Sequence, residues 1–210
     1  LFPLTLFRTR TFSVGLLGNL FARLGSSGMP YMIPLMLQVA LGYPPTHAGL
    51  MMMPVALAGM FSKRIVVPLV QRFGYRNVLV VNTVLTGLTM ASFALVDVGQ
   101  PTWLHIVQFA VFGAVNSLQF TVMNTVTLRD LDREFASSGN SLLSMVMMLA
   151  AGFGAAAAGS LLAAFAPLES HGATAALHAT FLCVGAITLT STLIFWQLPD
   201  TGPEPKQIEE

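Results

Sequence analysis

Charge is what this sequence has least of. Lys, Arg, Asp and Glu together make up 9% of the 210 residues, whereas 54% are hydrophobic and the mean hydropathy is +0.72. Because soluble domains carry about 25% charged residues, this composition excludes an ordinary soluble domain. It predicts an all-α integral membrane protein with the lipid bilayer as a partner. The sequence also has no basic patch of the kind that binds nucleic acid.

Cysteine is rarer still, and the common cofactor motifs are absent. The single cysteine, Cys183, excludes an internal disulfide framework. No phosphate-binding loop and no zinc-ligand spacing occur, so we expect no metal and no cofactor. The chain opens at Leu1 without the basic region and cleavage site of a signal peptide, and is therefore interpreted as a piece of a longer protein.

Long apolar runs are what the sequence does contain. A bilayer is crossed by about 20 apolar residues in a helix. On that length we predict six spans in a bundle covering residues 1–198, near 12–41, 47–70, 78–96, 103–126, 141–165 and 175–198. The remainder, 199–210, is rich in Pro and Glu and is predicted to be a disordered cytoplasmic tail.

The basic residues predict the orientation of these spans. The segments that flank the spans alternate along the chain between two kinds. One kind contains no Lys or Arg, and the other, which includes both ends of the fragment, carries Arg8, Arg10, Arg72, Arg76, Arg129, Arg133 and Lys206. Since positive loops stay inside, both ends of the fragment are expected in the cytoplasm of a bacterial inner membrane. Lys63 and Arg64 fall inside the second span. They either extend to the inner interface or, for Lys63, face a cavity.

The first span carries a charge at mid-depth. Arg23 lies about 16 Å along a helix from Phe12, near the middle of a hydrocarbon core of roughly 30 Å. On a helical wheel Asn19 and Ser26 share its side. A buried charge in a span faces a protein interior or a watery cavity, so we predict that Asn19, Arg23 and Ser26 line a substrate cavity.

The fourth span shows a second polar stripe with aromatic residues beside it. Amides that orient a ligand and rings that supply contact area suit a pocket for large, partly apolar molecules. Hydrogen bonding between helices explains the amides equally well. The stripe adds these residues to the predicted cavity: Gln108, Phe112, Asn116, Gln119, Phe120 and Met123.

The two stripes fall on the first and fourth of six spans. Each is the first helix of a set of three, which is the 3+3 inverted repeat of secondary transporters. The fifth span is instead dominated by small residues four apart, a spacing that lets helices approach closely. This predicts a packing surface, offered to a helix that the fragment lacks, which comprises Gly152, Ala155, Ala156, Gly159 and Ala163.

The loop after the second span carries a resemblance. The segment 68–77 is similar to the loop motif of the major facilitator superfamily: Arg72, Gly74 and Arg76 match it, whereas Val67 and Gln71 replace the usual Gly and Asp. Together with the segments LFRTRTF and 23–30, and with Asn124-Thr125 followed by 136–141, it resembles the fourteen-helix drug:proton antiporter branch and its multidrug resistance members.

The resemblance implies half of a transporter. These would be its last six helices, and an N-terminal half with the proton-coupling acidic residues would lie upstream. Small molecules would be exported by alternating access, driven by the proton motive force and without a cofactor. The protein would not be an enzyme. Because Arg23 is cationic, export of an organic anion, or of its metal complex, is the alternative.

The sequence allows three further interpretations. The segment 25–28 fits the Gly-x-Ser-Gly pattern. A remote alternative is therefore an intramembrane serine protease, with Ser27 as the nucleophile and His178 as its base. Arg72 and Arg76 would latch the cytoplasmic side by pairing with acids such as Asp130, Asp132 and Glu134, or would only set topology. The histidines near outer ends are expected to be interfacial rather than pH sensors or metal ligands: His47, His105, His171 and His178.

Overall fold

The chain forms a bundle of helices. The computed structural model describes residues 7–97, 99–167 and 174–199, and every regular element in those ranges is helical, as predicted. In chain order they are α1 (Arg10–Ser26), α2 (Met29–Leu35), the π-helix η2 (Met36–Ala40), α3 (Pro45–Met51), α4 (Met53–Ser92), the 3-10 helix η3 (Phe93–Leu95), α5 (Thr102–Arg129), α6 (Arg133–Phe165) and α7 (Ala175–Phe195).

Helix α1 ends in the middle of the first predicted span. Its last turn closes with a hydrogen bond from the Ser27 N–H to the Arg23 carbonyl, 2.8 Å long. Pro30 follows at the start of α2, and proline has no N–H with which to continue the helix. The predicted span of residues 12–41 is thus divided, and Arg23 lies one turn before the division.

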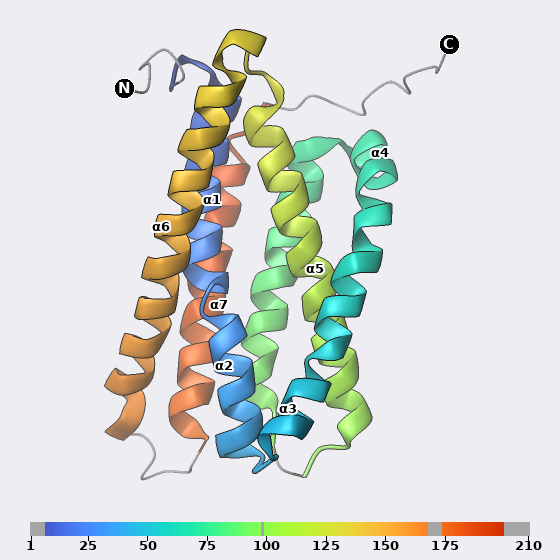
Figure 1. Ribbon diagram of the computed structural model, residues 1–210, viewed down its shortest axis with the longest axis vertical. Coiled ribbons are helices and arrows are strands. Elements are labelled where there is room, and N and C mark those ends of the chain that lie inside the picture. The colour runs from blue at the N-terminus through green and yellow to red at the C-terminus, as the bar shows by residue number, and fades with distance from the viewer. Residues whose placement is uncertain (1–6, 98, 168–173, 200–210) are drawn as a thin grey trace.

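Helix α4 is two helices joined at a sharp reversal. Gly74 has φ 76° and ψ 159°, a backbone conformation that glycine adopts far more easily than other residues. Figure 1 shows the first limb, residues 53–73, running to the upper end and the second limb, 75–92, running back beside it. The Asn77 side-chain amide donates to the Phe73 carbonyl at 3.1 Å, which satisfies an acceptor that the reversal frees.

Within the described residues, four stretches are long and apolar enough to cross a membrane: Pro45–Leu95, Thr102–Arg129, Glu134–Phe165 and Ala175–Phe195. The first has 51 residues, or about 77 Å as a straight helix, which is more than twice the thickness of a hydrocarbon core. The reversal at Gly74 divides that length. Large apolar side chains are exposed on the outer surface, among them Leu95 at 73%, Met148 at 79% and Leu193 at 72%.

Aromatic and aliphatic clusters hold the bundle together. Phe93 lies at the centre of one, with ring centroids 5.7 Å from Phe109, 5.7 Å from Phe112 and 5.4 Å from Phe181. These contacts join η3 to α5 and α7. At the other side, Phe12 and Leu16 of α1 pack in one buried cluster with Leu142 and Leu143 of α6.

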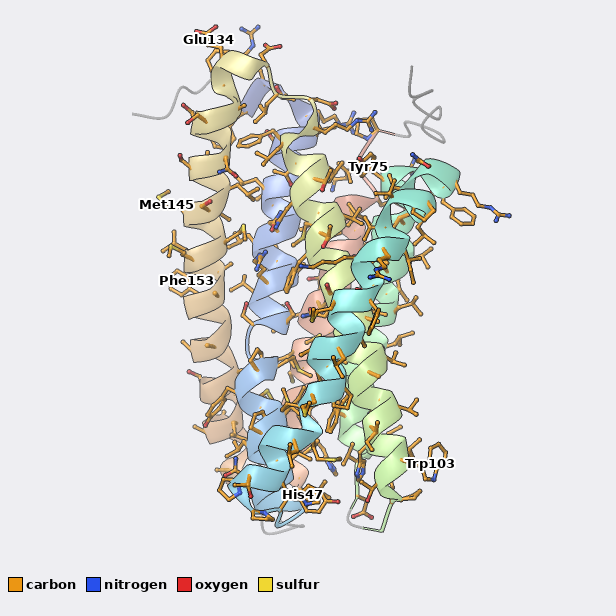
Figure 2. All side chains as sticks on the ribbon, turned by 45° about the vertical axis from the view of Figure 1, so that its right-hand side comes forward. His47, Tyr75, Trp103, Glu134, Met145 and Phe153 are labelled. Atoms are coloured by element: carbon orange, nitrogen blue, oxygen red, sulfur yellow. The ribbon has the colours of Figure 1, made fainter. Side chains whose placement is uncertain are left out.

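The turns between helices gather at two ends. Figure 2 shows Tyr75 and Glu134 at one end and His47 and Trp103 at the opposite end. The first end contains the reversal at Gly74 and the turn between α5 and α6, where Arg129 and Asp130 lie. It is therefore the end that holds the basic loops.

Candidate functional site

The candidate site begins at Arg23 in the last turn of α1. Its guanidinium carbon lies 4.1 Å from the centroid of the Phe120 ring of α5, and its Nε donates to Asn19 Oδ1 at 3.2 Å. A cation over an aromatic face is stabilised by the ring's electron density, more strongly where water is excluded. A guanidinium has five N–H donors, and within the described residues only Nε is hydrogen-bonded. The terminal NH₂ groups thus remain available to a ligand or to water.

A groove of about 490 Å³ lies beside Phe120, between the first limb of α4 and α5. Close approach of these helices forms its floor: a Cβ on Gly113 would overlap the Val55 carbonyl, and Ser117 Oγ donates to the Gly59 carbonyl at 2.8 Å. The lining mixes apolar and polar side chains, and consists of Val55, Ala56, Gly59, Met60, Lys63, Gly113, Asn116, Ser117, Phe120, Thr121 and Asn124.

Two amide oxygens in this groove have no donor. Asn116 Oδ1 and Asn124 Oδ1 are both inaccessible to solvent, and neither has a hydrogen-bond partner in the part of the chain that the structure describes. A buried acceptor without a donor costs about 1–3 kcal/mol, so such groups are usually satisfied by water or by a ligand. Their positions, eight residues apart along α5, mark one polar face.

Lys63 lies on the other wall of the groove. Its side chain is exposed and lines both this groove and a smaller one of about 190 Å³ next to Thr121 and Thr125. Of the two alternatives that the sequence left open, this arrangement corresponds to a cavity-facing lysine. Lys63 and Arg23 flank α5 from α4 and α1, and no Asp or Glu belongs to the groove lining. The groove is therefore bordered by cationic side chains and has no carboxylate in its lining.

Most of the other predicted cavity residues are packed in the interior instead. Asn19 is fully buried, with Nδ2 3.3 Å from the Gly15 carbonyl and 3.4 Å from Thr127 Oγ1. Ser26 is also buried and donates to the Ala22 carbonyl of its own helix at 2.9 Å. The prediction that Asn19 and Ser26 line the cavity needs correction, because backbone and hydroxyl groups already engage their polar atoms.

The same correction applies to four residues of α5. Gln119 is buried, accepts a bond from Asn82 at 2.8 Å and donates one to Thr83 at 2.7 Å. Gln108 donates to Ser92 Oγ at 2.7 Å, at a separate pocket. Phe112 packs edge-on against Phe93, and Met123 points into a buried hydrophobic cluster. Only Asn116 and Phe120 of the predicted α5 stripe line the groove.

Four polar groove residues were outside the predicted cavity set, with Lys63 given only as an alternative: Lys63, Ser117, Thr121 and Asn124. The sequence contained a signal for the last three. Asn116, Phe120 and Asn124 recur every four residues, and Ser117 with Thr121 recur beside them, which places all five on one helical face. The predicted stripe followed the neighbouring face through Gln119 and Met123.

The loop motif is fastened by aromatic rings. The Arg76 guanidinium lies 5.2 Å from the Trp196 ring at the end of α7, and the Arg129 guanidinium lies 4.9 Å from the Tyr75 ring. Arg72 lies over Phe73 at 5.4 Å. Asp130, one of the acids suggested as a latch partner, lies 3.7 Å from Arg129. Aromatic rings thus lie beside both Arg72 and Arg76.

The small residues of α6 face two ways. Gly152 and Gly159 would have open space around a Cβ, and Ala155, Ala156 and Ala163 are exposed. A neighbouring face makes the close contact, because a Cβ on Gly154 would lie 2.8 Å from the Leu24 carbonyl oxygen. The predicted packing set thus has no helix packed against it in the described part of the chain. Helix α6 contacts α1 through Gly154 instead.

The protease arrangement is not formed. His178 Nε2 lies 3.0 Å from the Val96 carbonyl, whereas Ser27 adjoins Gly154 of α6. His47 stacks on Tyr43 at 4.7 Å, and the buried His105 has no partner for either ring nitrogen among the described residues. The described residues contain no cluster of three side chains that could hold a metal ion. His171 lies outside the described residues.

An all-helical bundle whose described residues include four helices long and apolar enough to cross a membrane has the architecture of an integral membrane protein. The chain belongs to the Major Facilitator Superfamily, whose family model matches residues 15–210. This is a family of transporters and not of enzymes, and it confirms the resemblance inferred from the loop motif.

Curated relatives are similar in sequence to nearly the whole chain. It is 49% identical over 204 residues to a protein of Cronobacter sakazakii, and 47% identical over 206 residues to one of Citrobacter koseri. Both are provisionally named multidrug resistance protein MdtD. The matches cover 95% of this chain but 43% of each relative. The chain therefore spans less than half the length of the curated relatives it matches.

Proposed function

We propose that this chain is the C-terminal half of a secondary transporter that exports small, amphipathic molecules from bacteria. Its segments cross the inner membrane six times as a 3+3 inverted repeat, with the end that contains Tyr75 and Glu134 in the cytoplasm. An upstream half of the same protein faces the groove between α4 and α5. The two halves rock about the bound molecule and give alternating access. The proton motive force drives the cycle through acidic residues upstream.

The observation that carries this proposal is the pair of buried, unpartnered amide oxygens beside an aromatic ring. Asn116 and Asn124 line the groove with amides whose oxygens have no donor among the described residues and would accept from a ligand once the amides turn toward it. Phe120 offers an apolar face, and the groove has room for part of a drug-sized molecule. A closed packing interface would have satisfied these oxygens within the protein. The names of the relatives point to the same class of substrate.

The test uses the full-length protein that contains this chain, reconstituted into proteoliposomes. Binding of an amphipathic dye is compared for the parent, Asn124→Leu and Gln108→Leu. Gln108 is a matched control because it is an amide on the same helix whose hydrogen bond lies away from the groove. We expect Asn124→Leu to weaken binding about tenfold, the value of one lost hydrogen bond, and Gln108→Leu to leave it unchanged. Equal losses in both would contradict the placement of the site.

A second candidate is export of an organic anion, alone or as a metal complex. The groove has Lys63 on one side and Arg23 next to Phe120 on the other, with no carboxylate in its lining. The affinities of an anionic and a neutral ligand are measured for the parent and for Arg23→Gln. Selective loss of the anion supports this candidate. A uniform loss makes Arg23 a structural residue.

A further inference from the structure

A second groove lies between the two limbs of α4, near the reversal at Gly74. Its volume is about 250 Å³, and its walls are almost entirely apolar. Phe73, Val81 and Leu85 are 49%, 58% and 47% exposed, so the groove opens on the outer surface. Both limbs contribute to the lining, which consists of Leu69, Phe73, Asn77, Val78, Val81, Asn82 and Leu85. It shares no residue with the groove beside Phe120.

Polar groups stand at one end of this apolar groove. Arg72 is exposed, and its guanidinium lies 5.4 Å from the ring of Phe73, which forms part of the wall. Asn77 is exposed at the start of the second limb and lines the same end. Arg76 is placed differently, over Trp196 of α7. Arg72 is therefore the cation of this groove.

We propose that the groove binds an anionic phospholipid. One acyl chain lies between the limbs against Phe73, Val81 and Leu85, and the phosphodiester lies at Arg72. From Asn77 to Leu85 the second limb rises about 12 Å, so the groove follows a chain from the headgroup region well into the hydrocarbon layer. Arginine suits this position because its planar donors match the oxygens of a phosphate.

The charge of the surroundings selects the headgroup. Between Ser62 and Val96 the sequence contains no Asp or Glu, so neither limb offers a carboxylate to the ammonium of an ethanolamine headgroup. Phosphatidylglycerol lacks that ammonium and keeps its full negative charge for Arg72. Anionic lipids are attracted to basic residues at a membrane surface in the same way. The expected preference is thus for phosphatidylglycerol over phosphatidylethanolamine with identical acyl chains.

The test measures lipid bound to the full-length protein by native mass spectrometry after addition of either lipid. Arg72→Gln is compared with Arg64→Gln, a matched control: Arg64 is an exposed arginine of the same limb, 5.8 Å from the Phe61 ring and outside this groove. We expect Arg72→Gln to weaken phosphatidylglycerol binding about fivefold and Arg64→Gln to leave it unchanged. Equal effects of the two variants, or equal binding of the two lipids in the parent, would overturn the proposal.

The apolar wall is tested separately. Val81→Trp fills the groove, whereas Val67→Trp adds the same bulk at a valine of similar exposure, 60% against 58%, that lines another groove. Only Val81→Trp is expected to reduce lipid retention. Glycerol phosphate, which has no acyl chains, should not compete; competition would assign the site to free phosphate. Lipid retention unchanged by Val81→Trp, as expected if an upstream helix covered the groove, would refute it.

This proposal goes beyond the transport function and can fail independently of it. The dye-binding comparison at Asn124 concerns a different groove, so loss of lipid binding in Arg72→Gln with normal dye binding leaves the proposed transport role intact. Thermal melting of each variant in detergent checks that the fold is kept.

Discussion

Two faces of helix α5 carry the same chemistry with opposite outcomes. On the inner face, Gln119 is hydrogen-bonded to Asn82 and Thr83, and the contact between α5 and the second limb of α4 is closed. On the groove face, Asn116 and Asn124 keep amide oxygens without partners in the described part of the chain. The residue type is therefore no guide to the role. What separates an amide that holds helices together from one that serves a ligand is whether its neighbours already satisfy it.

The comparison also shows why the groove stays open. Gly113 and Gly59 bring the backbones of α5 and α4 together, and Ser117 bonds across the contact. Beside this narrow contact, the larger side chains of Phe120 and Met60 line the groove. A small-residue contact and an adjoining groove are thus parts of one arrangement.

The largest expected effect is on that contact. In Gly113→Val the new side chain overlaps backbone atoms of Val55, which cannot rotate away. We expect a loss of about 3 kcal/mol in the free energy of unfolding, measured by SDS titration in mixed micelles. Gly152→Val on α6 is the control, since a Cβ there meets nothing within 4 Å. Equal stability of the two variants would mean that the helices do not meet at Gly113.

The next effect separates the two faces of α5 directly. Gln119→Leu removes two hydrogen bonds to α4 and should lower the free energy of unfolding by about 1–2 kcal/mol. Asn124→Leu removes an acceptor that has no donor and should leave stability unchanged or raise it slightly. The same micelle titration measures both. A larger loss in Asn124→Leu than in Gln119→Leu would reverse the assignment of the faces.

The sequence predicted the helices better than it predicted which way they face. The apolar runs indicated the all-helical fold, and the motif around Gly74 marked the loop where α4 reverses. In a soluble helix, hydrophobic periodicity also identifies the buried face. In α5 it does not, because the side toward lipid and the side toward the protein core are both apolar. The polar sector predicted for α5 therefore combined Gln119, which lies on the closed side, with Asn116, which lies at the edge of the open side.

Charged residues were easier to interpret, although only in part. The depth of Arg23 predicted a protein-facing guanidinium, and it lies over Phe120 beside the groove. Its neighbours Asn19 and Ser26 share its side of the helix, yet they pack into contacts within the protein. Those contacts come from α5 and from the backbone, which the pattern of a single span does not include. For the same reason, the sequence could not decide whether Lys63 extends to the membrane interface or faces a cavity.

Arg23 allows the comparison to be sharpened at the border of the two faces. Arg23→Lys keeps the charge but loses the bond from Nε to Asn19 and the flat contact with Phe120. We expect a loss of about 0.5–1 kcal/mol in the free energy of unfolding, with anion binding weakened less than in Arg23→Gln. Paired stability and binding measurements on the full-length protein test this. Identical binding by the lysine and glutamine variants would exclude a role for the charge.

The smallest effect is expected on α6, where two glycines five residues apart have different surroundings. Gly154→Ala places a methyl group against the Leu24 carbonyl and should lower stability, whereas Gly159→Ala meets open space and should stay within about 0.5 kcal/mol of the parent. SDS titration of both variants in the isolated fragment and in the full-length protein makes this comparison informative. If Gly159→Ala destabilises only the full-length protein, then the exposed small residues of α6 pack against the upstream half, as their spacing predicts. If it is neutral in both, that face meets lipid, and the four-residue spacing has no packing role.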